Sequence, residues 1–356
     1  METIDPSPHP SRGRASETLL QEPTELGHDV IVVGASAGGV QALLELVRHL
    51  PADLPAAVFV VLHVAATEKS VLPKILDRQS QLPVKHAVDG EPIVLGQIYV
   101  APPDRHLLVQ KDQVRVVRGP RENNHRPAVD PLFRSAALAY GPRVVGVILS
   151  GSLDDGAAGL HAVSRAGGVG VVQDPEDALY RGMPDNAIAA DEPDYVVPLE
   201  RVADVLTQLT QQSAAEVHEE IPDDIEQETA YAELDSPTYE MPQGERSVFS
   251  CPDCGGVLYE LEDEGLLRYR CRIGHAYAAE SLHAAQSEAI DQALGTALRA
   301  LEERAVLSRR LARRLSESGP SQGSRYSERA DEADMNAAIL RRAIAGRAGP
   351  VQEAQS

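Results

Sequence analysis

Three short segments of the sequence each present a side chain of a type that enzymes use in acyl transfer. Ser36 lies in a glycine-rich run, His63 directly follows an apolar run, and the acidic pair Asp154-Asp155 precedes a glycine. A serine hydroxyl is a weak nucleophile at neutral pH and needs a neighbouring base. An imidazole can take and return a proton near pH 7, and a carboxylate on its far nitrogen orients the ring. Together these residue types predict a hydrolytic triad.

Each segment taken alone has a simpler interpretation. A glycine-rich turn often holds a phosphate, a lone histidine after a strand is often structural, and Asp-Asp-Gly is a common helix-capping turn. The dinucleotide-binding fingerprint, however, needs glycine where Ser36 stands and an acidic residue where His63 stands. Because the three segments follow three predicted strands, the joint pattern favours a catalytic site over nucleotide binding.

The elements that must position these residues form an α/β fold. Short β-branched runs predict buried parallel strands, and helical patterns lie between them. This alternation is typical of a doubly wound, mainly parallel sheet, in which sites form at the carboxyl ends of the strands. An insertion of antiparallel hairpins is expected in the middle. The expected strands are residues 29–34, 57–62, 144–149 and 169–172, the helices 40–50, 130–140 and 156–166, and the hairpin strands 96–101, 107–109 and 114–117.

Composition limits the classes of protein to consider. The chain has 356 residues, of which 43% are hydrophobic, and a formal net charge of −21. No apolar run approaches the ~18–20 residues that a membrane span needs, and the N-terminus lacks the apolar segment of a secretory signal. The negative charge argues against nucleic-acid binding. Three cysteines cannot form a disulfide framework, which predicts a reducing, cytoplasmic location.

All three cysteines fall in one stretch with the spacing of a metal site. Cys251 and Cys254 form a CxxC pair, and Cys271 and His275 follow after a gap of sixteen residues. Two ligands on a tight knuckle and two more after a hairpin can close a tetrahedron around Zn²⁺. A redox-active CxxC is the alternative, but that motif usually starts a helix. The sequence predicts a structural zinc site with these four ligands.

An acidic segment separates two folded parts. Residues 213–246 hold eleven Asp or Glu residues and one basic residue, with no sustained periodicity, which predicts a solvated linker. A long amphipathic pattern near the C-terminus predicts a helical hairpin that packs on its own domain or a partner rather than on a membrane. The expected order is a disordered tail at 1–28, a catalytic domain at 29–210, an acidic linker at 211–247, a zinc-knuckle module at 248–278, and a helical hairpin and tail at 279–356.

A series of motifs follows one order between residues 32 and about 206. The motifs are Val-Val-Gly-Ala-Ser-Ala-Gly-Gly at 32–39, Leu-His-Val at 62–64, Tyr-Val-Ala-Pro-Pro-Asp-Arg-His at 99–106, His-Arg-Pro-Ala-Val-Asp-Pro-Leu-Phe at 125–133, Gly-Val-Ile-Leu-Ser-Gly at 146–151, Asp-Gly-Ala-Ala-Gly at 155–159 and Gly-Met-Pro at 182–184. In these motifs the chain resembles the catalytic domain of the chemotaxis protein-glutamate methylesterases, of the CheB type.

The resemblance implies a function and a role for each residue. Ser36 is implied as the nucleophile, His63 as general base and acid, and Asp155 as the orienting carboxylate, because the family places the acid directly before glycine. The implied reaction is hydrolysis of glutamate γ-methyl esters on a methylated chemoreceptor-like protein, with glutamine deamidation as a further reaction and no cofactor for catalysis. The alternative is a non-enzymatic signalling module that retains the fold.

The chain departs from the family pattern in two places. Family members commonly carry an N-terminal receiver domain, and the 28 residues before the first strand are too few for one. Phosphorylation control in cis is therefore expected to be absent, and the C-terminal half is expected to regulate activity and to bind a regulatory protein. Ser152 stands where the family often has methionine, which predicts a different substrate preference.

Overall fold

The computed structural model describes residues 27–64, 70–215, 222–233, 242, 244–263, 265–316 and 320–347. The chain separates into two compact units, one ending at Ser281 and the other beginning at Leu282. Nearly all of the predicted tail at 1–28 lies outside the described residues. The finer division of the first unit into catalytic domain, linker and knuckle module stays a prediction.

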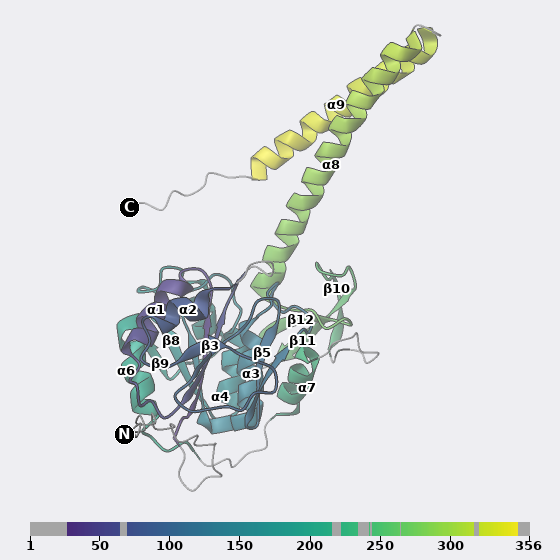
Figure 1. The fold of residues 1–356 in the computed structure, drawn as a ribbon. Helices are drawn as coiled ribbons and strands as arrows, with labels where there is room; N and C mark the ends of the chain where they lie inside the picture. The colour runs from purple at the N-terminus through teal and green to yellow at the C-terminus, as the bar shows by residue number, and fades with distance from the viewer. Residues whose placement is uncertain are drawn as a thin grey trace, which may run out of the picture. The chain divides into compact units, whose positions relative to one another are not determined.

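A seven-stranded sheet forms the centre of the first unit (Figure 1). All of its neighbouring strands pair in parallel, in the order β3-β4-β2-β1-β7-β8-β9. The predicted α/β class with a mainly parallel sheet is therefore confirmed. The strands are β1 (Val30–Ala35), β2 (Ala57–Leu62), β3 (Val84–His86), β4 (Ile98–Val100), β7 (Val144–Ile148), β8 (Val169–Gln173) and β9 (Tyr195–Val197).

Helices cover both faces of this sheet, which explains why its strands are apolar throughout rather than alternating. One core joins Ile31 and Val33 of β1 to Leu43 and Leu206 of the helices on one face. The other core joins Val32 to helices on the opposite face. The first face carries α1 (Gly39–His49), α2 (Leu72–Asp77) and α6 (Leu199–Leu209), and the second carries α3 (Val129–Tyr140), α4 (Ala157–Arg165) and α5 (Gly182–Ala190), with a 3-10 turn at Gly141–Arg143.

The hairpin prediction is partly wrong. Residues 98–100 do not form a hairpin strand; β4 lies inside the main sheet, parallel to β2 on one side and to β3 on the other. All three residues of β4 are buried, so the sequence shows no alternation of apolar and polar side chains there. Without that alternation, a hairpin strand could not be distinguished from a strand of the main sheet. The hairpin itself consists of β5 (His106–Gln110) and β6 (Gln113–Val117), which pair antiparallel.

A small antiparallel sheet follows the acidic segment and holds the cysteines. Its strands β10 (Glu245–Ser250), β11 (Val257–Asp263), β12 (Leu266–Cys271) and β13 (Ala276–Ala278) pair in sequence order. Strand β13 also contacts the part of the first unit that holds the seven-stranded sheet, called the sheet domain below. Ala276 of β13 forms a parallel bridge with Glu122 of that domain. The sheet that carries the cysteines is therefore in direct contact with the sheet domain.

The acidic segment is not a plain spacer over all of its described length. Residues Asp223–Ala232 form helix α7, which buries Ile225, Thr229 and Ala232. Asp224 pairs with Arg165 of α4 at 2.7 Å. The interpretation as a solvated linker is wrong for this stretch, because its acidic side chains find arginines distant in sequence. The rest of the segment lies largely outside the described residues.

Helix α7 contributes to a buried cluster of five charges. Glu228 of α7 accepts hydrogen bonds from Arg270 at 3.0 and 2.7 Å and pairs with Arg268, both on β12. Glu122 accepts from Arg134 of α3 at 2.8 Å and from Arg270 at 3.3 Å. The cluster therefore joins the sheet domain, α7 and the cysteine-bearing sheet through charge-assisted bonds.

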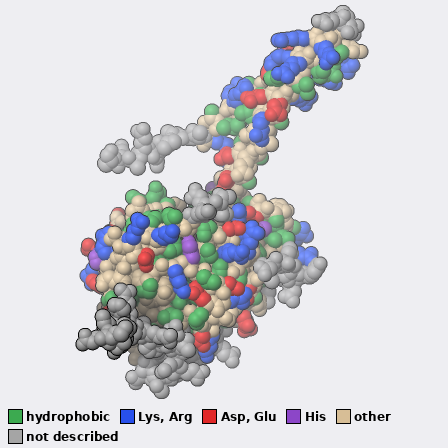
Figure 2. Space-filling view, viewed as in Figure 1, with side chains coloured by type: hydrophobic (Ala, Val, Ile, Leu, Met, Phe, Trp, Pro, Cys, Tyr) green, Lys and Arg blue, Asp and Glu red, His purple; other side chains and the backbone are tan. Residues whose placement is uncertain are grey.

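The second unit continues the chain in two long helices. Helix α8 (Ala279–Ser316) begins in the first unit, and α9 (Pro320–Arg347) pairs with it through Arg341 and Glu302 at 2.6 Å and through Arg347 and Asp291 at 2.9 Å. These pairs fit the predicted helical hairpin. Exposed basic side chains gather around the end of α8 and the first turns of α9 (Figure 2), among them Arg309, Arg310, Arg313, Arg314 and Arg325. Within the described residues, no helix combines the length and the apolar character that a membrane span requires.

The buried charge cluster makes stability sensitive to acid. Burial alone would raise the pKa of Glu122 and of Glu228, but the neighbouring arginine charges outweigh it and hold both pKa values below the ordinary 4.5. A depressed carboxyl pKa stabilises the fold above the unfolded pKa, and this stability is lost as pH falls through the folded pKa.

Glu228→Gln should therefore lower the free energy of unfolding by about 3–5 kcal/mol at pH 7, because it removes the carboxylate that Arg268 and Arg270 share while both guanidinium groups stay buried. Below pH 4.5 the difference from the wild type should shrink. Urea unfolding at a series of pH values, followed by far-UV circular dichroism, measures the free energy of unfolding. The matched control is Asp204→Asn, whose pair with Arg201 is exposed and worth less than about 1 kcal/mol. If the free energies of unfolding of the wild type and Glu228→Gln differ by the same amount at every pH, the lowered pKa of Glu228 is contradicted.

Candidate active site and metal centre

Ser36 lies in the tight turn between β1 and α1. Its backbone N–H donates to the carbonyl of Ser150, which follows β7, at 3.0 Å. Gly38 has φ 74°, a left-handed conformation that glycine adopts without strain, and α1 begins at the next residue. Strand β1 lies between β2 and β7. The chain passes from β1 to β2 on one side, whereas it passes from β7 to β8 on the other side, so the strand order reverses between β1 and β7. Ligand sites in doubly wound folds form at such a switch point.

His63 follows β2 and lies between the other two predicted triad residues. Its Nδ1 is 3.0 Å from the Ser36 hydroxyl, and its Nε2 is 2.6 Å from Oδ2 of Asp155. The imidazole side chain is only 5% exposed. Since a carboxylate only accepts, Nε2–H donates to Asp155 and Nδ1 is left to accept the hydroxyl proton. The structure thus brings Ser36, His63 and Asp155 together in one hydrogen-bonded row.

Asp155 accepts hydrogen bonds at both carboxylate oxygens. Oδ2 also accepts from the Val129 N–H at 2.7 Å, and Oδ1 accepts from the Asn123 side chain at 2.9 Å and the Asp130 N–H at 3.3 Å. Burial acts to raise the pKa of Asp155, but the hydrogen bond and charge of His63 and the Val129 N–H outweigh it and hold the pKa far below its usual range. The carboxylate is therefore charged when it orients His63.

Asp154, the neighbouring carboxylate, has a different set of partners. Its oxygens accept from the backbone N–H groups of Glu280 at 2.9 Å and Ser281 at 3.2 Å, and from the Ser281 hydroxyl. These donors belong to the first turn of α8, so Asp154 caps that helix. Of the two adjacent carboxylates, the one in contact with His63 is Asp155.

Three further residues at the site were missed by sequence reasoning. The His125 ring stacks on the His63 ring, with centroids 3.6 Å apart and planes 11° apart. Burial and the charge of His63 lower the pKa of His125 to about 3, so this neighbour is uncharged. Asn123 donates to both Asp155 and Asp130. The motif at 125–133 contained His125 and Asp130, but only distances between segments reveal their partners.

Asp130 fixes the turn that carries Asp155. Its Oδ1 accepts from the N–H groups of Gly156 at 3.0 Å and Gly159 at 2.7 Å, at the start of α4. Burial and the negative charge of Asp155 raise the pKa of Asp130. The two buried carboxyl groups therefore have opposite pKa shifts, and the one beside His63 keeps the charge.

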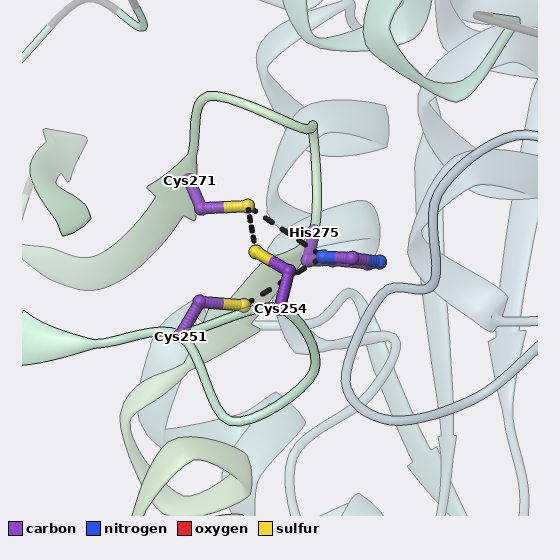
Figure 3. A group of neighbouring side chains, drawn as sticks. All are labelled: Cys251, Cys254, Cys271 and His275. Atoms are coloured by element: carbon purple, nitrogen blue, oxygen red, sulfur yellow. Dashed lines mark hydrogen bonds between the residues drawn. The ribbon is translucent and has the colours of Figure 1, made fainter. Parts of the chain in front are cut away.

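The four predicted metal ligands also lie together. One ligand atom from each of Cys251, Cys254, Cys271 and His275 lies within 4.8 Å of all the others, and Figure 3 shows the side chains converging. The sulfurs of Cys254 and Cys271 are 3.7 Å apart, and His275 Nδ1 is 3.6 Å from the sulfurs of Cys251 and Cys271. With Zn–S bonds of about 2.3 Å, tetrahedral geometry separates two sulfurs by about 3.8 Å and a sulfur and a nitrogen by about 3.5 Å. The donor set and its spacing fit zinc.

Two backbone turns hold these ligands. The N–H of Gly255 donates to the Cys251 carbonyl at 2.8 Å, and that of Gly274 donates to the Cys271 carbonyl at 2.9 Å. Gly255 and Gly274 have φ 70° and 104°, so both turns use a conformation that favours glycine. The Tyr277 hydroxyl donates to Asp253 at 2.6 Å beside the cluster. The ligands are thus presented by two rigid knuckles.

A nucleophile, a base and an orienting carboxylate at the carboxyl edge of a doubly wound sheet are the arrangement of a serine-type hydrolase. Comparison with known proteins gives the family: residues 31–206 match the family model described as CheB methylesterase. The chain belongs to the CheB methylesterase family, since it also covers 97% of a 38% identical relative. The resemblance drawn from the sequence motifs is confirmed.

Three similar proteins illustrate the match. The relative just mentioned is a putative protein-glutamate methylesterase/protein-glutamine glutaminase of Leptospira interrogans, which aligns with 52% of this chain. Protein-glutamate methylesterase/protein-glutamine glutaminase 1 of Xanthomonas campestris is 43% identical over 188 residues, which are 52% of each chain. The crystal structure of the Thermotoga maritima CheB methylesterase catalytic domain is 35% identical with a TM-score of 0.49, and the alignment covers 51% of this chain and 98% of that one. The chain thus spans about half the length of the Xanthomonas relative.

Asp155→Asn should lower kcat for a small activated ester such as p-nitrophenyl acetate by about 10⁴-fold. The asparagine amide can donate to Nε2 of His63, which forces the ring proton onto Nδ1 and leaves no base for Ser36. Steady-state hydrolysis measures the effect, with circular dichroism to confirm folding. The exposed Asp53→Asn is the matched control. A loss of less than tenfold in Asp155→Asn would contradict the role of Asp155.

Proposed function

We propose that this chain hydrolyses γ-methyl esters of glutamate side chains on a methylated, chemoreceptor-like protein. The observation that carries the proposal is the hydrogen-bonded row Ser36, His63, Asp155. Membership of the CheB methylesterase family supports the reaction, and the relatives' names supply the substrate class. Hydrolysis at this site needs no cofactor, since the nucleophile and the proton carrier are side chains of the chain itself.

The geometry supports a two-step mechanism. Ser36 Oγ attacks the ester carbonyl while its proton passes to Nδ1 of His63, and Asp155 stabilises the resulting imidazolium. The tetrahedral intermediate collapses, the C–O bond to the methoxy group breaks, and His63 returns the proton so that methanol leaves. Water then attacks the acyl-enzyme, giving up a proton to His63, and the glutamate carboxyl group is released with Ser36 restored.

The developing oxyanion needs donors beside Ser36. The Ser36 N–H is already bound to the Ser150 carbonyl, so it is not the donor in this structure. We assign the role to the N–H groups of Ala37 and Gly38, which directly precede α1, where the helix dipole favours negative charge. We propose glutamine deamidation at the same site: His63 gives its proton to the amide nitrogen, the C–N bond breaks, and ammonia leaves.

For the cysteine cluster we propose a structural zinc site. Four protein ligands complete a tetrahedron and leave no open position for water or substrate, which is the pattern of structural rather than catalytic zinc. The ion would hold together a small sheet with few buried apolar side chains. Cysteines used as thiolate ligands rather than in disulfides support a reducing compartment, the cytoplasm. The regulatory partner of the C-terminal half stays a prediction.

Ser36→Ala should abolish methanol release from a methyl-labelled receptor, with a fall of at least about 10⁴-fold, because no other group in the row can form the acyl-enzyme. Counting volatile label released from the methylated protein measures the activity. Ser164→Ala, an exposed serine on α4, is the matched control and should keep the wild-type rate. Methanol release that survives Ser36→Ala, or a folded wild type that releases none, would overturn the proposal.

The purified chain should contain one zinc per molecule, and Cys254→Ser should reduce this content to well below one. Elemental analysis gives the stoichiometry, and a thiol reagent should titrate all three cysteines only after chelation. Cys254 is the exposed ligand, so its substitution disturbs packing least. His283→Ala, an exposed histidine outside the cluster, should retain the metal. Full zinc content in Cys254→Ser would rule out this ligand set.

A further inference from the structure

A tight turn at residues 122–125 touches both the catalytic row and the cysteine-bearing sheet. Glu122 and His125 exchange backbone hydrogen bonds at 3.2 and 2.8 Å, and the two residues between them, Asn123 and Asn124, have φ 50° and 67°. Positive φ at both central positions is the signature of a type I′ turn, for which asparagine and glycine are suited. We call residues 122–125 the bridging turn.

Asn123 is the residue of the bridging turn that faces two ways. On one side its amide donates to Asp155 and Asp130, each at 2.9 Å. On the other side its carbonyl oxygen accepts from the Ala278 N–H at 2.8 Å, and its own backbone N–H donates to the Ala276 carbonyl at 2.8 Å. The side chain is buried, and both amide hydrogens and the oxygen are engaged. Its orientation is therefore set by β13 as well as by the carboxylates.

Strand β13 starts directly after a metal ligand. His275 precedes Ala276, and the Cys271 N–H donates to the His275 carbonyl at 2.9 Å. Toward the sheet domain, the Ala276 N–H donates to the Arg121 carbonyl at 3.2 Å. The strand is thus held at one end by the metal knuckle and along its edge by residues 121–123. A short, continuous path leads from His275 through Ala278 and Asn123 to Asp155.

A second contact reaches the same catalytic turn. Asp154, the residue next to Asp155, accepts hydrogen bonds from Glu280 and Ser281, which follow β13 after one residue. Asn186 of α5 also donates to Glu280 at 2.9 Å. Both members of the Asp154-Asp155 pair are therefore positioned by residues that come shortly after His275 in the chain. Displacement of β13 would release both contacts together.

We propose that Asn123 is a positioning residue through which the metal-bound knuckle sets the orientation of Asp155 and His63. This inference rests on the proposed hydrolase and zinc sites. With the metal bound, β13 holds the Asn123 amide against Asp155, and the carboxylate keeps the imidazole aligned with Ser36. When the metal is lost, β13 keeps its pairing with β12 but loses its anchor at His275. The strand then shifts, Asn123 turns away from Asp155, and the catalytic row becomes misaligned while substrate binding is kept.

The test compares Asn123→Gly with Asn124→Gly in the full-length protein. Glycine keeps the left-handed backbone of either position, so both variants preserve the turn and only the first removes the two-sided amide. Asn123→Gly should lower kcat for a glutamyl methyl ester peptide by about tenfold to a hundredfold with KM unchanged, as expected for loss of a hydrogen bond to a charged group. Asn124→Gly should behave as the wild type. Equal activity of the two variants would overturn the proposal.

A double-mutant cycle of Cys254→Ser and Asn123→Gly tests whether the catalytic row depends on the metal. The readout is the rate at which a fluorophosphonate labels Ser36, which requires the catalytic row but no protein substrate. Cys254→Ser should slow labelling as much as Asn123→Gly does, and the double variant should be no slower than either. Additive effects would show two independent routes and refute the coupling. The same comparison can be made without a cysteine substitution, by removing zinc with a chelator and then restoring it. The rate of Ser36 labelling should fall and recover in the wild type and should not change in Asn123→Gly.

Different results would refute the proposed substrate and the proposed coupling between the metal and the catalytic row. Labelling of Ser36 that depends on Asn123 and metal, without methanol release from any methylated protein, would refute the proposed substrate and support the coupling. Methanol release that is insensitive to metal and to Asn123→Gly would support the proposed function and refute the coupling. Wild-type protein that the fluorophosphonate does not label would count against both.

Discussion

The sheet domain depends on keeping one buried carboxylate charged beside an imidazole. Asp155 is 2% exposed, and a buried charge without partners is very costly. The fold supplies those partners from three places: the N–H groups of Val129 and Asp130 at the start of α3, the Asn123 amide, and the His63 ring. The α3 start adds the favourable end of a helix dipole. The positions of α3, of the bridging turn and of β2 are all constrained by this requirement.

A second buried carboxyl group, that of Asp130, makes it more costly to keep Asp155 charged. Two carboxylates that share a site cannot both be ionised cheaply, so their pKa values are driven apart. Asp155 has the imidazole and keeps its charge, while Asp130 has a raised pKa and mainly holds the Gly156 and Gly159 N–H groups. The Asn123 amide lies between them and donates to both. A single neutral side chain thus separates two groups that would otherwise repel.

What the sequence could predict follows from how local each signal is. Ser36 and His63 come directly after strands, and parallel strands bring their carboxyl ends to one edge, so their meeting was predictable. The cysteine spacing is equally local. Strand β4 was misassigned because three buried residues show no period, and α7 because its acidic residues are neutralised by arginines more than forty residues away, as with Glu228 and Arg270. Asn123 gave no signal at all, since its partners lie in three separate segments.

The charge balance explains why helix α7, the described helix of the acidic segment, packs on the folded structure. Arg268 and Arg270 from the cysteine-bearing sheet and Arg134 from α3 are buried, and Glu122 alone could not neutralise three guanidinium groups. Glu228 of α7 supplies the second carboxylate, and its pKa is held low by the arginines. A buried ion group of this kind contributes little net stability, but removing one partner is costly. Helix α7 therefore does more than link two parts of the chain. Its Glu228 completes the contact between the cysteine-bearing sheet and the bridging turn.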